Sequence, residues 1–375
     1  MSRIKYPYNY DPKKRRMAKL YAEGRKYSIL LNITLPLLLF AMLIYSGFGT
    51  SLALIFPNIA VFTLVIFVLM TFVRFPMSLY FSYIYEHKYK LSRYTFPAWL
   101  KDYLKMVALR FVVVVPVIYV FYQVLPLEYW FLYSTAAYFI LLIIVDALFP
   151  EIILPLFYKI HPYKHKAHTR IFLNMLRKAG VTKIKGVYVA DESKKSIKAN
   201  AMFTGIGKTK RIILFDTLTN NFTDDEIETV IAHEAAHYIH KDTWRYVILE
   251  AIKMLIIFVV IRNIFIYFSL SIVDFANLPI FLLSYYLLNI MFMPLENAYS
   301  RHRESQCDLF ALNASRKWVA QRSAEKRLAD IALSDLNPHP LRIFFFQTHP
   351  PVKERVRMCE EWSKKYGRKN KKEKR

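Results

Sequence analysis

Long apolar runs dominate the pattern of hydrophobic and polar positions along this chain. From residue 27 to residue 73 there are 47 consecutive positions without Asp, Glu, Lys or Arg, which is enough for two helices of about 20 residues across a membrane. We expect spans near 29–47 and 52–73, with a hairpin at Gly47 to Ser51. Four further apolar stretches follow, at 106–124, 129–149, 246–272 and 277–295. The pattern predicts a mainly α-helical, polytopic membrane bundle of about six spans.

The positions of the 53 Lys and Arg residues predict how these spans are oriented. Short loops rich in basic residues stay in the cytoplasm. Basic residues crowd the N-terminal segment, the 74–103 loop, the 151–243 region and the tail after residue 296, whereas the three other turns carry none. We therefore expect both termini and the large polar region to be cytoplasmic, in the cell membrane of a prokaryote or the endoplasmic reticulum of a eukaryote. The charged opening argues against a signal peptide.

Composition agrees with a membrane protein and limits the classes of binding partner that we expect. Hydrophobic residues make up 55% of the chain and aromatic residues 16%, while the net charge is +25. Such a charge raises the possibility of a nucleic-acid partner, but basic loops beside a membrane attract anionic headgroups. We expect membrane lipids, and no nucleic acid, as partners. The two cysteines, Cys307 and Cys359, predict no disulfide framework, and Cys307 is expected to be a packing residue.

Between the fourth and fifth spans lies the one sizeable polar region. Residues 186–190 and 211–215 have the composition of strands, with Ala199 to Met202 between them. The expected domains follow in order: 1–28 basic segment, 29–150 four spans, 151–243 peptidase domain, 244–295 membrane hairpin, 296–360 second part of the peptidase domain, and 361–375 basic tail. An edge strand here would let a peptide add as a further strand.

The candidate chemistry lies at 231–237, where the sequence reads IAHEAAH. On a helix, His233 and His237 share one face, so each can offer a ring nitrogen to one zinc ion. Glu234 then lies beside the open coordination position, where it can take a proton from water. Thr223 is a plausible N-cap, and acidic residues fill the first turn after it. The motif predicts a zinc metallopeptidase with one zinc per chain.

A catalytic zinc needs a third protein ligand, and the sequence offers four candidates. His240 lies two turns beyond His233, about 10 Å along the helix axis, and cannot share the ion with it. Asp242 is farther still and is more typical of a residue that orients a ligand. Glu304 and Asp308 are four apart and would share a helix face, one binding zinc and the other orienting a ligand. Such a pair on its own is more often a solvated surface.

The predicted span at 246–272 contains three charged residues, Glu250, Lys253 and Arg262. Charges within a bilayer usually face protein or a watery cavity. Glu250 and Lys253 are three apart and are able to pair. Two interpretations stay open: the helix enters the membrane only near Met254, or these residues line a hydrated chamber next to the zinc.

Several separated motifs resemble the type 1 CaaX prenyl proteases, which are membrane zinc endopeptidases. Over roughly residues 70–360 the similarity is carried by FPMSLY at 75–80, FP at 149–150, DESKKSIKANAMFTG at 191–205, KRIILFDTL at 210–218, SRHRESQCD at 300–308 and THPP at 348–351. Their agreement in order makes the resemblance specific. It implies a bundle of membrane helices with a zincin-like α+β peptidase domain.

The resemblance also implies roles for individual residues. It makes Glu304 the third zinc ligand and Asp308 its partner, with Arg355 supporting the site. It implies that Asn200 and Ala201 contact the substrate strand. His349 becomes a donor to the oxyanion, where charge develops on the carbonyl oxygen. The implied reaction removes the last three residues of a prenylated CaaX protein.

Departures from the family keep other functions open. The motif reads HEAAH where the family usually has HELGH, Asp242 is more like the HtpX-type stress proteases, and the chain is one span short at its N-terminus. A quality-control protease that cleaves unmodified membrane proteins is the alternative. A transporter or scaffold with a structural zinc is disfavoured, because such a site needs four protein ligands and has no use for Glu234.

Overall fold

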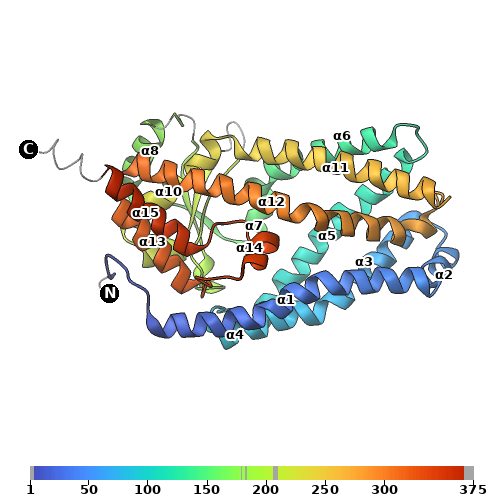
Figure 1. The fold of residues 1–375 in the computed structure, drawn as a ribbon, viewed down its shortest axis with the longest axis horizontal. Coiled ribbons are helices and arrows are strands. Elements are labelled where there is room, and N and C mark those ends of the chain that lie inside the picture. Colours follow the sequence, from blue (N-terminus) through green and yellow to red (C-terminus); the bar gives the residue numbers. More distant parts are fainter. Residues whose placement is uncertain (1–3, 179, 182–183, 206–209, 367–375) are drawn as a thin grey trace, which may run out of the picture.

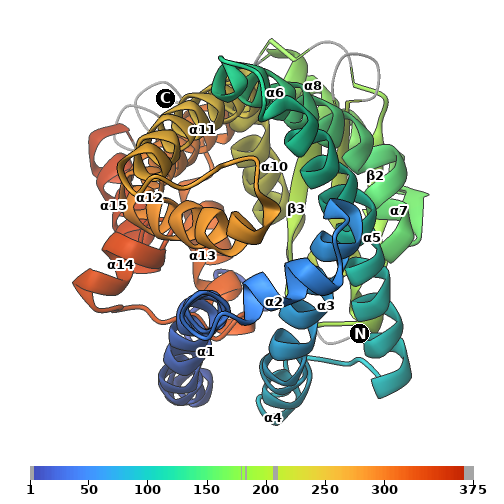
Figure 2. The same cartoon turned by 90° about the vertical axis from the view of Figure 1, so that its right-hand side faces the viewer.

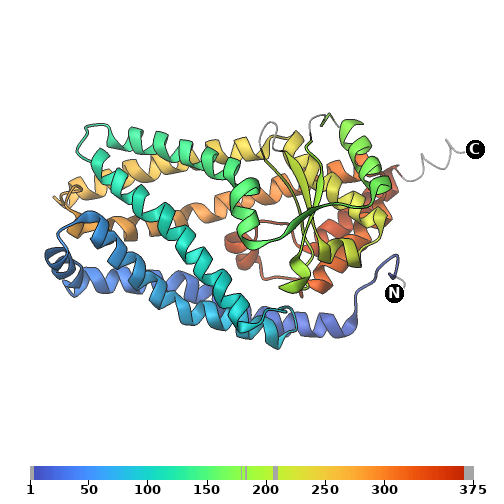
Figure 3. The same ribbon diagram turned by 180° about the vertical axis from the view of Figure 1, so that it is seen from behind.

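A computed structural model describes residues 4–178, 180–181, 184–205 and 210–366 of the chain. Long helices gather at one end of the elongated molecule, and a small sheet with shorter helices lies at the other (Figures 1 and 3). This is the predicted combination of a helical membrane bundle with an α+β unit.

The bundle holds the long apolar helices. Its elements are α1 (Pro12–Tyr45), α2 (Phe48–Ile55), α3 (Ile59–Ser78), α4 (Tyr85–Lys88), α5 (Phe96–Val124), α6 (Trp130–Leu148), α7 (Leu154–Phe157), α11 (Asp242–Tyr267) and α12 (Leu278–Ser315). Among the described residues, five helical segments are long and apolar enough to cross a membrane, namely 12–45, 59–88, 96–124, 130–157 and 275–315. The remaining predicted span is α11, which packs on α6 and α12.

The helix that holds the first predicted span is longer than the span, and the helix predicted for the second span is broken. Helix α1 begins at Pro12 rather than near residue 29, because Asp11 caps it by accepting a hydrogen bond from Lys13 N at 2.8 Å. The expected continuous helix at 52–73 is broken into α2 and α3. Pro57 has no backbone N–H and disfavours a helical Phe56, and Asn58 then caps α3. The hairpin is therefore longer than Gly47 to Ser51.

The charges of α11 have partners. Lys253 Nζ lies 2.8 Å from Glu250 Oε2 and 2.5 Å from Glu296 Oε1, so the expected Glu250–Lys253 pair is confirmed and is joined by a residue of α12. All three line a cavity of about 450 Å³ between α11 and α12. Arg262 stacks on the ring of Phe131.

The α+β unit contains a four-stranded sheet. Its strands are β1 (Ile160–Pro162), β2 (Val187–Ala190), β3 (Ala201–Thr204) and β4 (Arg211–Phe215), in the order β1-β2-β4-β3. Only β2 and β4 are parallel. The two predicted strands are confirmed, and β3, which forms from the segment between them, lies at the edge.

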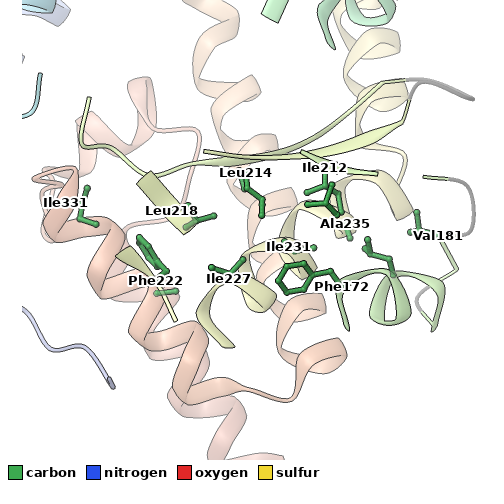
Figure 4. Close-up of a cluster of buried hydrophobic side chains, with 14 residues drawn as sticks. Phe172, Val181, Ile212, Leu214, Leu218, Phe222, Ile227, Ile231, Ala235 and Ile331 are labelled. Atoms are coloured by element: carbon green, nitrogen blue, oxygen red, sulfur yellow. The ribbon is translucent and has the colours of Figure 1, made fainter. Parts of the chain in front are cut away.

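The rest of the α+β unit consists of shorter helices. They are α8 (Lys166–Lys178), α9 (Asp216–Asn221), α10 (Asp224–Ile239), α13 (Trp318–Ile331), α14 (Pro340–Phe346) and α15 (Val352–Tyr366). The core between the sheet, α8, α10 and α13 includes Ile212, Leu214, Ile231 and Phe172, each at most 1% exposed (Figure 4). Of the expected basic tail, residues 361–366 belong to α15, and residues 367–375 lie outside the described part.

The chain passes between the bundle and the α+β unit at three places, the first of which is the short link from α7 to β1. Helix α11 starts directly after α10, and α12 is a single helix of 38 residues that leaves the bundle and packs against α10. The segment before α1 and the first turn of α1 dock on α13, where Tyr8 donates to Asp330 at 2.7 Å and Arg15 pairs with the same carboxylate. Viewed along the long axis, the helices surround the molecule's centre (Figure 2).

Candidate metal centre

Helix α10 has a well-defined start. Thr223 accepts a hydrogen bond from Glu226 N at 3.4 Å, and Glu226 Oε2 accepts one from Thr223 N at 2.8 Å. This capping box confirms Thr223 as the N-cap and satisfies two backbone N–H groups that a helix end leaves without partners. Asp224 and Asp225 follow in the first turn, where negative charge is favourable. The register of the helix is thereby fixed two turns before the histidines.

Three side chains converge where α10 meets α12. His233 and His237, one turn apart on α10, face Glu304 on α12, and one donor atom from each lies within 4.8 Å of the others. His233 Nε2 is 3.2 Å from Glu304 Oε2, and His237 Nε2 is 3.5 Å from Glu304 Oε1. The structure therefore brings together the two histidines of the motif and the glutamate that the resemblance implied.

Two aspartates orient the histidine rings. His233 Nδ1 lies 2.9 Å from Asp308 Oδ1, and His237 Nδ1 lies 2.9 Å from Asp242 Oδ2. A neutral imidazole that donates its Nδ1–H to a carboxylate keeps its lone pair on Nε2. In this neutral form both Nε2 lone pairs, which face the carboxylate of Glu304, become available to a metal ion. Asp242, which the sequence suggested as a residue that orients a ligand, has that position.

The donor set fits a metal ion. Glu304 Oε2 is buried and has no hydrogen-bond partner in the part of the chain that the structure describes. Burial disfavours its charge, but His233, His349 and His237 outweigh burial and lower the pKa of Glu304 to about 2. A charged carboxylate with an unsatisfied oxygen, beside two imidazole lone pairs, forms the three-ligand set typical of catalytic zinc sites.

Asp308 is held in turn by Arg355. The guanidinium of Arg355 donates from Nε and Nη2 to the two oxygens of Asp308, at 2.7 and 2.6 Å. Burial opposes the ionisation of Asp308, yet Arg355 and His233 hold its pKa well below its usual range. Arg355 Nη1 also pairs with Glu325 at 2.8 Å. Arg355 thus supports the site through Asp308, in the place that the resemblance implied.

The remaining predicted residues line one cavity of about 180 Å³. Asn200, Ala201, Glu234 and His349 line it, together with His233, Asp308 and Arg355. Glu234 accepts a hydrogen bond from the backbone of Phe203 on β3, and burial raises the pKa of Glu234. His349, whose side chain is 58% exposed, places Nε2 3.4 Å from Glu304 Oε2.

Two nearby groups lie outside the three-residue cluster. His240 packs its ring against Phe310 with centroids 5.8 Å apart, which agrees with its exclusion as a shared ligand. Cys307 is buried, with Sγ 3.4 Å from His237 Nδ1, and burial raises the pKa of the thiol. It remains a protonated packing residue, as expected, and Cys359 is likewise buried and free.

Three further contributors to the site were not predicted from the sequence. Gln321 Nε2 donates to the carbonyl of Asp308 at 3.1 Å, and Glu325, one turn later on α13, binds Arg355. The backbone N–H of Phe203 reaches Glu234. Polar residues four apart on a helix are usually solvated, and a backbone donor has no signature in sequence. Only the burial of this face of α13 distinguishes Gln321 and Glu325 from ordinary solvated helix residues.

The fold and the site together define a membrane-embedded metalloprotease. The chain belongs to peptidase family M48: the model of that family matches residues 162–363. A second model, described as the CAAX prenyl protease N-terminal region with five membrane helices, matches residues 17–159. The predicted family is therefore confirmed, and M48 peptidases are metal-dependent.

Curated relatives agree with this assignment. The chain is 28% identical over 318 residues to CAAX prenyl protease 1 of Saccharomyces cerevisiae, covering 77% of this chain and 69% of that protein. It is 26% identical over 371 residues to the uncharacterized metalloprotease YhfN of Bacillus subtilis, covering 93% and 86%. The crystal structure of Ste24p from S. mikatae has the same fold, with a TM-score of 0.82, 23% identity, and coverage of 93% of this chain and 89% of that one.

Proposed function

We propose that this chain is a zinc endopeptidase in which His233, His237 and Glu304 hold one zinc ion. The observation that carries the proposal is the convergence of two imidazole Nε2 atoms on the carboxylate of Glu304, whose buried Oε2 has no hydrogen-bond partner in the described residues. A bound zinc supplies Lewis-acid chemistry, because it polarises a carbonyl and lowers the pKa of water toward about 7.

Glu234 is the proposed general base. It lines the catalytic cavity next to His233, and its raised pKa brings it closer to the operating pH, which favours proton transfer from an attacking water. The hydrogen bond from Phe203 N–H fixes the carboxylate relative to the edge strand. After attack, the same group returns the proton to the leaving amine.

His349 is the proposed donor to the developing oxyanion. Its ring lies on the open side of the cavity, within 3.4 Å of Glu304 and more than half exposed. A donor placed where charge develops lowers the barrier without binding the ground state more tightly. Asp308 and Arg355 act only through His233, so we assign them a positioning role.

The peptide substrate is proposed to lie along β3. This strand pairs with β4 on one side only, and its free side faces α10. An extended peptide can add to such an edge by main-chain hydrogen bonds. Asn200 Oδ1 accepts the N–H of Ala201 at 2.9 Å at the start of this edge. Both residues line the catalytic cavity, which supports a contact with the substrate near the scissile bond.

The proposed substrate is a prenylated CaaX protein, from which the last three residues are removed. Similarity to proteins named CAAX prenyl protease 1 across several organisms supports it. Quality-control cleavage of unmodified membrane proteins is the alternative, favoured by HEAAH in place of HELGH and by Asp242. The peptidase region and both termini are proposed to be cytoplasmic, because the basic loops lie on that side.

Mass spectrometry of two peptides separates the two substrates. The protein purified in detergent is incubated with a farnesylated CaaX peptide and with an unmodified membrane-protein fragment. Release of the C-terminal tripeptide from the farnesylated peptide, with the same peptide lacking its farnesyl group left intact, is the expected result. Cleavage of the unmodified fragment alone would contradict CaaX processing and favour quality control.

A further inference from the structure

A second cavity, of about 340 Å³, lies within the bundle among α1, α3, α5 and α12. It shares no lining residue with the catalytic cavity. One face of α3 and one face of α5 supply most of its wall, at the helical spacing of 66, 67, 70, 74 and 103, 107, 110, 114. Figure 2 shows these helices side by side around the bundle.

The cavity has two chemically different ends. Helices α3 and α5 are antiparallel, since Phe67 packs on Phe111 and Phe75 packs on Tyr103. The end nearer the peptidase unit is polar and basic, with Asn32, Thr71, Arg74, Ser78, Tyr103 and Arg110. Toward the other end the wall is apolar except for Thr63, and consists of Phe40, Ile66, Val114, Ile118, Leu278 and Leu282.

The two arginines at the basic end have no counter-charge. The lining contains no Asp or Glu, and within the described residues neither Arg74 nor Arg110 forms an ion pair with a protein carboxylate. Arg74 Nε is buried and has no hydrogen-bond partner in that same part of the chain. A buried donor without a partner costs free energy, and charges within membrane segments are normally paired.

The two guanidinium groups are also placed to act together. Side chains on a helix lean toward its N-terminus. Because α3 and α5 run in opposite directions, Arg74 leans toward the level of Arg110, and Arg110 leans toward the level of Arg74. Arg74 directly follows the apolar run that ends at residue 73, and Arg110 lies near the start of the apolar stretch 106–124. Both are therefore in the half of their helices that is nearer the peptidase unit, on the side of one membrane leaflet.

We propose that this cavity binds an anionic phospholipid of that leaflet. The phosphate lies between Arg74 and Arg110, which can each bind it through two parallel N–H donors. The first part of one acyl chain lies along the apolar wall toward Leu278 and Leu282. A free phosphate would satisfy the arginines but would leave the apolar end in contact with water, so the wall favours the lipid.

Native mass spectrometry in a mild detergent tests this site. The protein is titrated with phosphatidylglycerol, with phosphatidylcholine, and with phosphatidylglycerol in the presence of inorganic phosphate. The variants are Arg74→Gln/Arg110→Gln, Arg110→Gln alone, and the matched control Lys101→Gln, which removes an exposed positive charge of α5 outside the cavity. Thermal stability and zinc content report whether each variant is folded.

Wild type and Lys101→Gln are expected to retain one phosphatidylglycerol that inorganic phosphate does not displace. The double variant is expected to bind it about 10- to 30-fold more weakly. If the double variant does not fold, the single variant Arg110→Gln tests the proposal, and its affinity for phosphatidylglycerol is expected to fall about fivefold. Equal retention of phosphatidylglycerol and phosphatidylcholine would overturn the proposal. So would an equal loss in Lys101→Gln, or displacement by inorganic phosphate.

Discussion

At the scale of single residues, Asp308 connects the metal site to the rest of the peptidase unit. One of its oxygens meets His233 Nδ1, and both oxygens accept from Arg355. Arg355 in turn binds Glu325 on α13. The orientation of the first histidine therefore depends on residues from α12, α13 and α15, none of which is near the HExxH motif in sequence.

Asp308→Asn is expected to weaken zinc binding by about 10- to 100-fold, because groups that orient a ligand are commonly worth that much. Competition with a fluorescent chelator measures the zinc affinity. Asp335→Asn, which alters a carboxylate paired with Arg342 outside the catalytic cavity, serves as the control. Unchanged zinc affinity in Asp308→Asn would show that the aspartate does not position His233.

Asn200→Ala is expected to raise KM about 5- to 10-fold while changing kcat little, since the loss of one hydrogen bond to a bound strand is worth about 1 kcal/mol. Steady-state kinetics with the cleaved peptide separate the two constants. Asn221→Ala, outside the cavity at the end of α9, is the matched control. A fall in kcat with unchanged KM would place Asn200 in the chemical step instead.

Spacing along the sequence predicted those residues of the site that lie on a single helix. His233, Glu234 and His237 follow from the four-residue period of one helix. The third ligand did not follow from spacing, since Glu304 and Asp308 also match a solvated helix face, and only the resemblance selected them. Neither the spacing nor the resemblance pointed to Phe203, Gln321 and Glu325, because their roles depend on packing between segments that are far apart in sequence.

At the scale of elements, two helices and one strand build the site. Helix α10 carries two of the proposed ligands and the proposed base, α12 carries Glu304 and Asp308, and β3 supplies the backbone donor to Glu234. Contacts between α10 and α12 are among the most extensive in the molecule. A change that alters the start of α10 should therefore affect the stability of the whole peptidase unit.

Thr223→Ala is expected to lower the free energy of unfolding by about 1 kcal/mol, since it removes the side-chain half of the capping box. Thermal unfolding in detergent measures the change. Thr169→Ala is the matched control, because the hydroxyl of Thr169 only donates to the carbonyl of His165. Equal stability of wild type and Thr223→Ala would mean that packing alone determines where α10 starts.

Element boundaries show what hydrophobic patterns omit. The long run from residue 27 to residue 73 predicted two spans, but hydrophobicity is insensitive to a helix break at Pro57 and Asn58, or to a helix that continues outward to Pro12. The strands at 186–190 and 211–215 were predictable from their β-branched residues. The edge strand β3 has a weaker signal and was expected only as a segment between them.

At the scale of the whole molecule, the bundle and the peptidase unit share helices. The 38 residues of α12 run from the bundle to the metal centre, and α10 leads directly into α11. The segment before α1 docks on α13. The proposed topology follows: the N-terminal segment and the peptidase unit face one side, and the turns after α1, α5 and α11 face the other.

Cysteine labelling tests this topology. Thr50→Cys, in the short helix α2 that connects α1 to α3, should react with a membrane-impermeant maleimide from outside intact cells or sealed vesicles. Lys13→Cys should react only after the membrane is opened. Cys307 and Cys359 are both 0% exposed, so they should contribute little background. Labelling of both positions from the same side would contradict the proposed orientation.

The central claim is a zinc peptidase built from His233, His237, Glu304 and Glu234, and paired measurements of zinc content and peptide hydrolysis in wild type and Glu234→Gln test it most directly. Both proteins should hold about one zinc per chain, and only wild type should cleave, with the variant slower by about 100- to 10,000-fold. Wild type without zinc, or hydrolysis by Glu234→Gln at the wild-type rate, would contradict the claim.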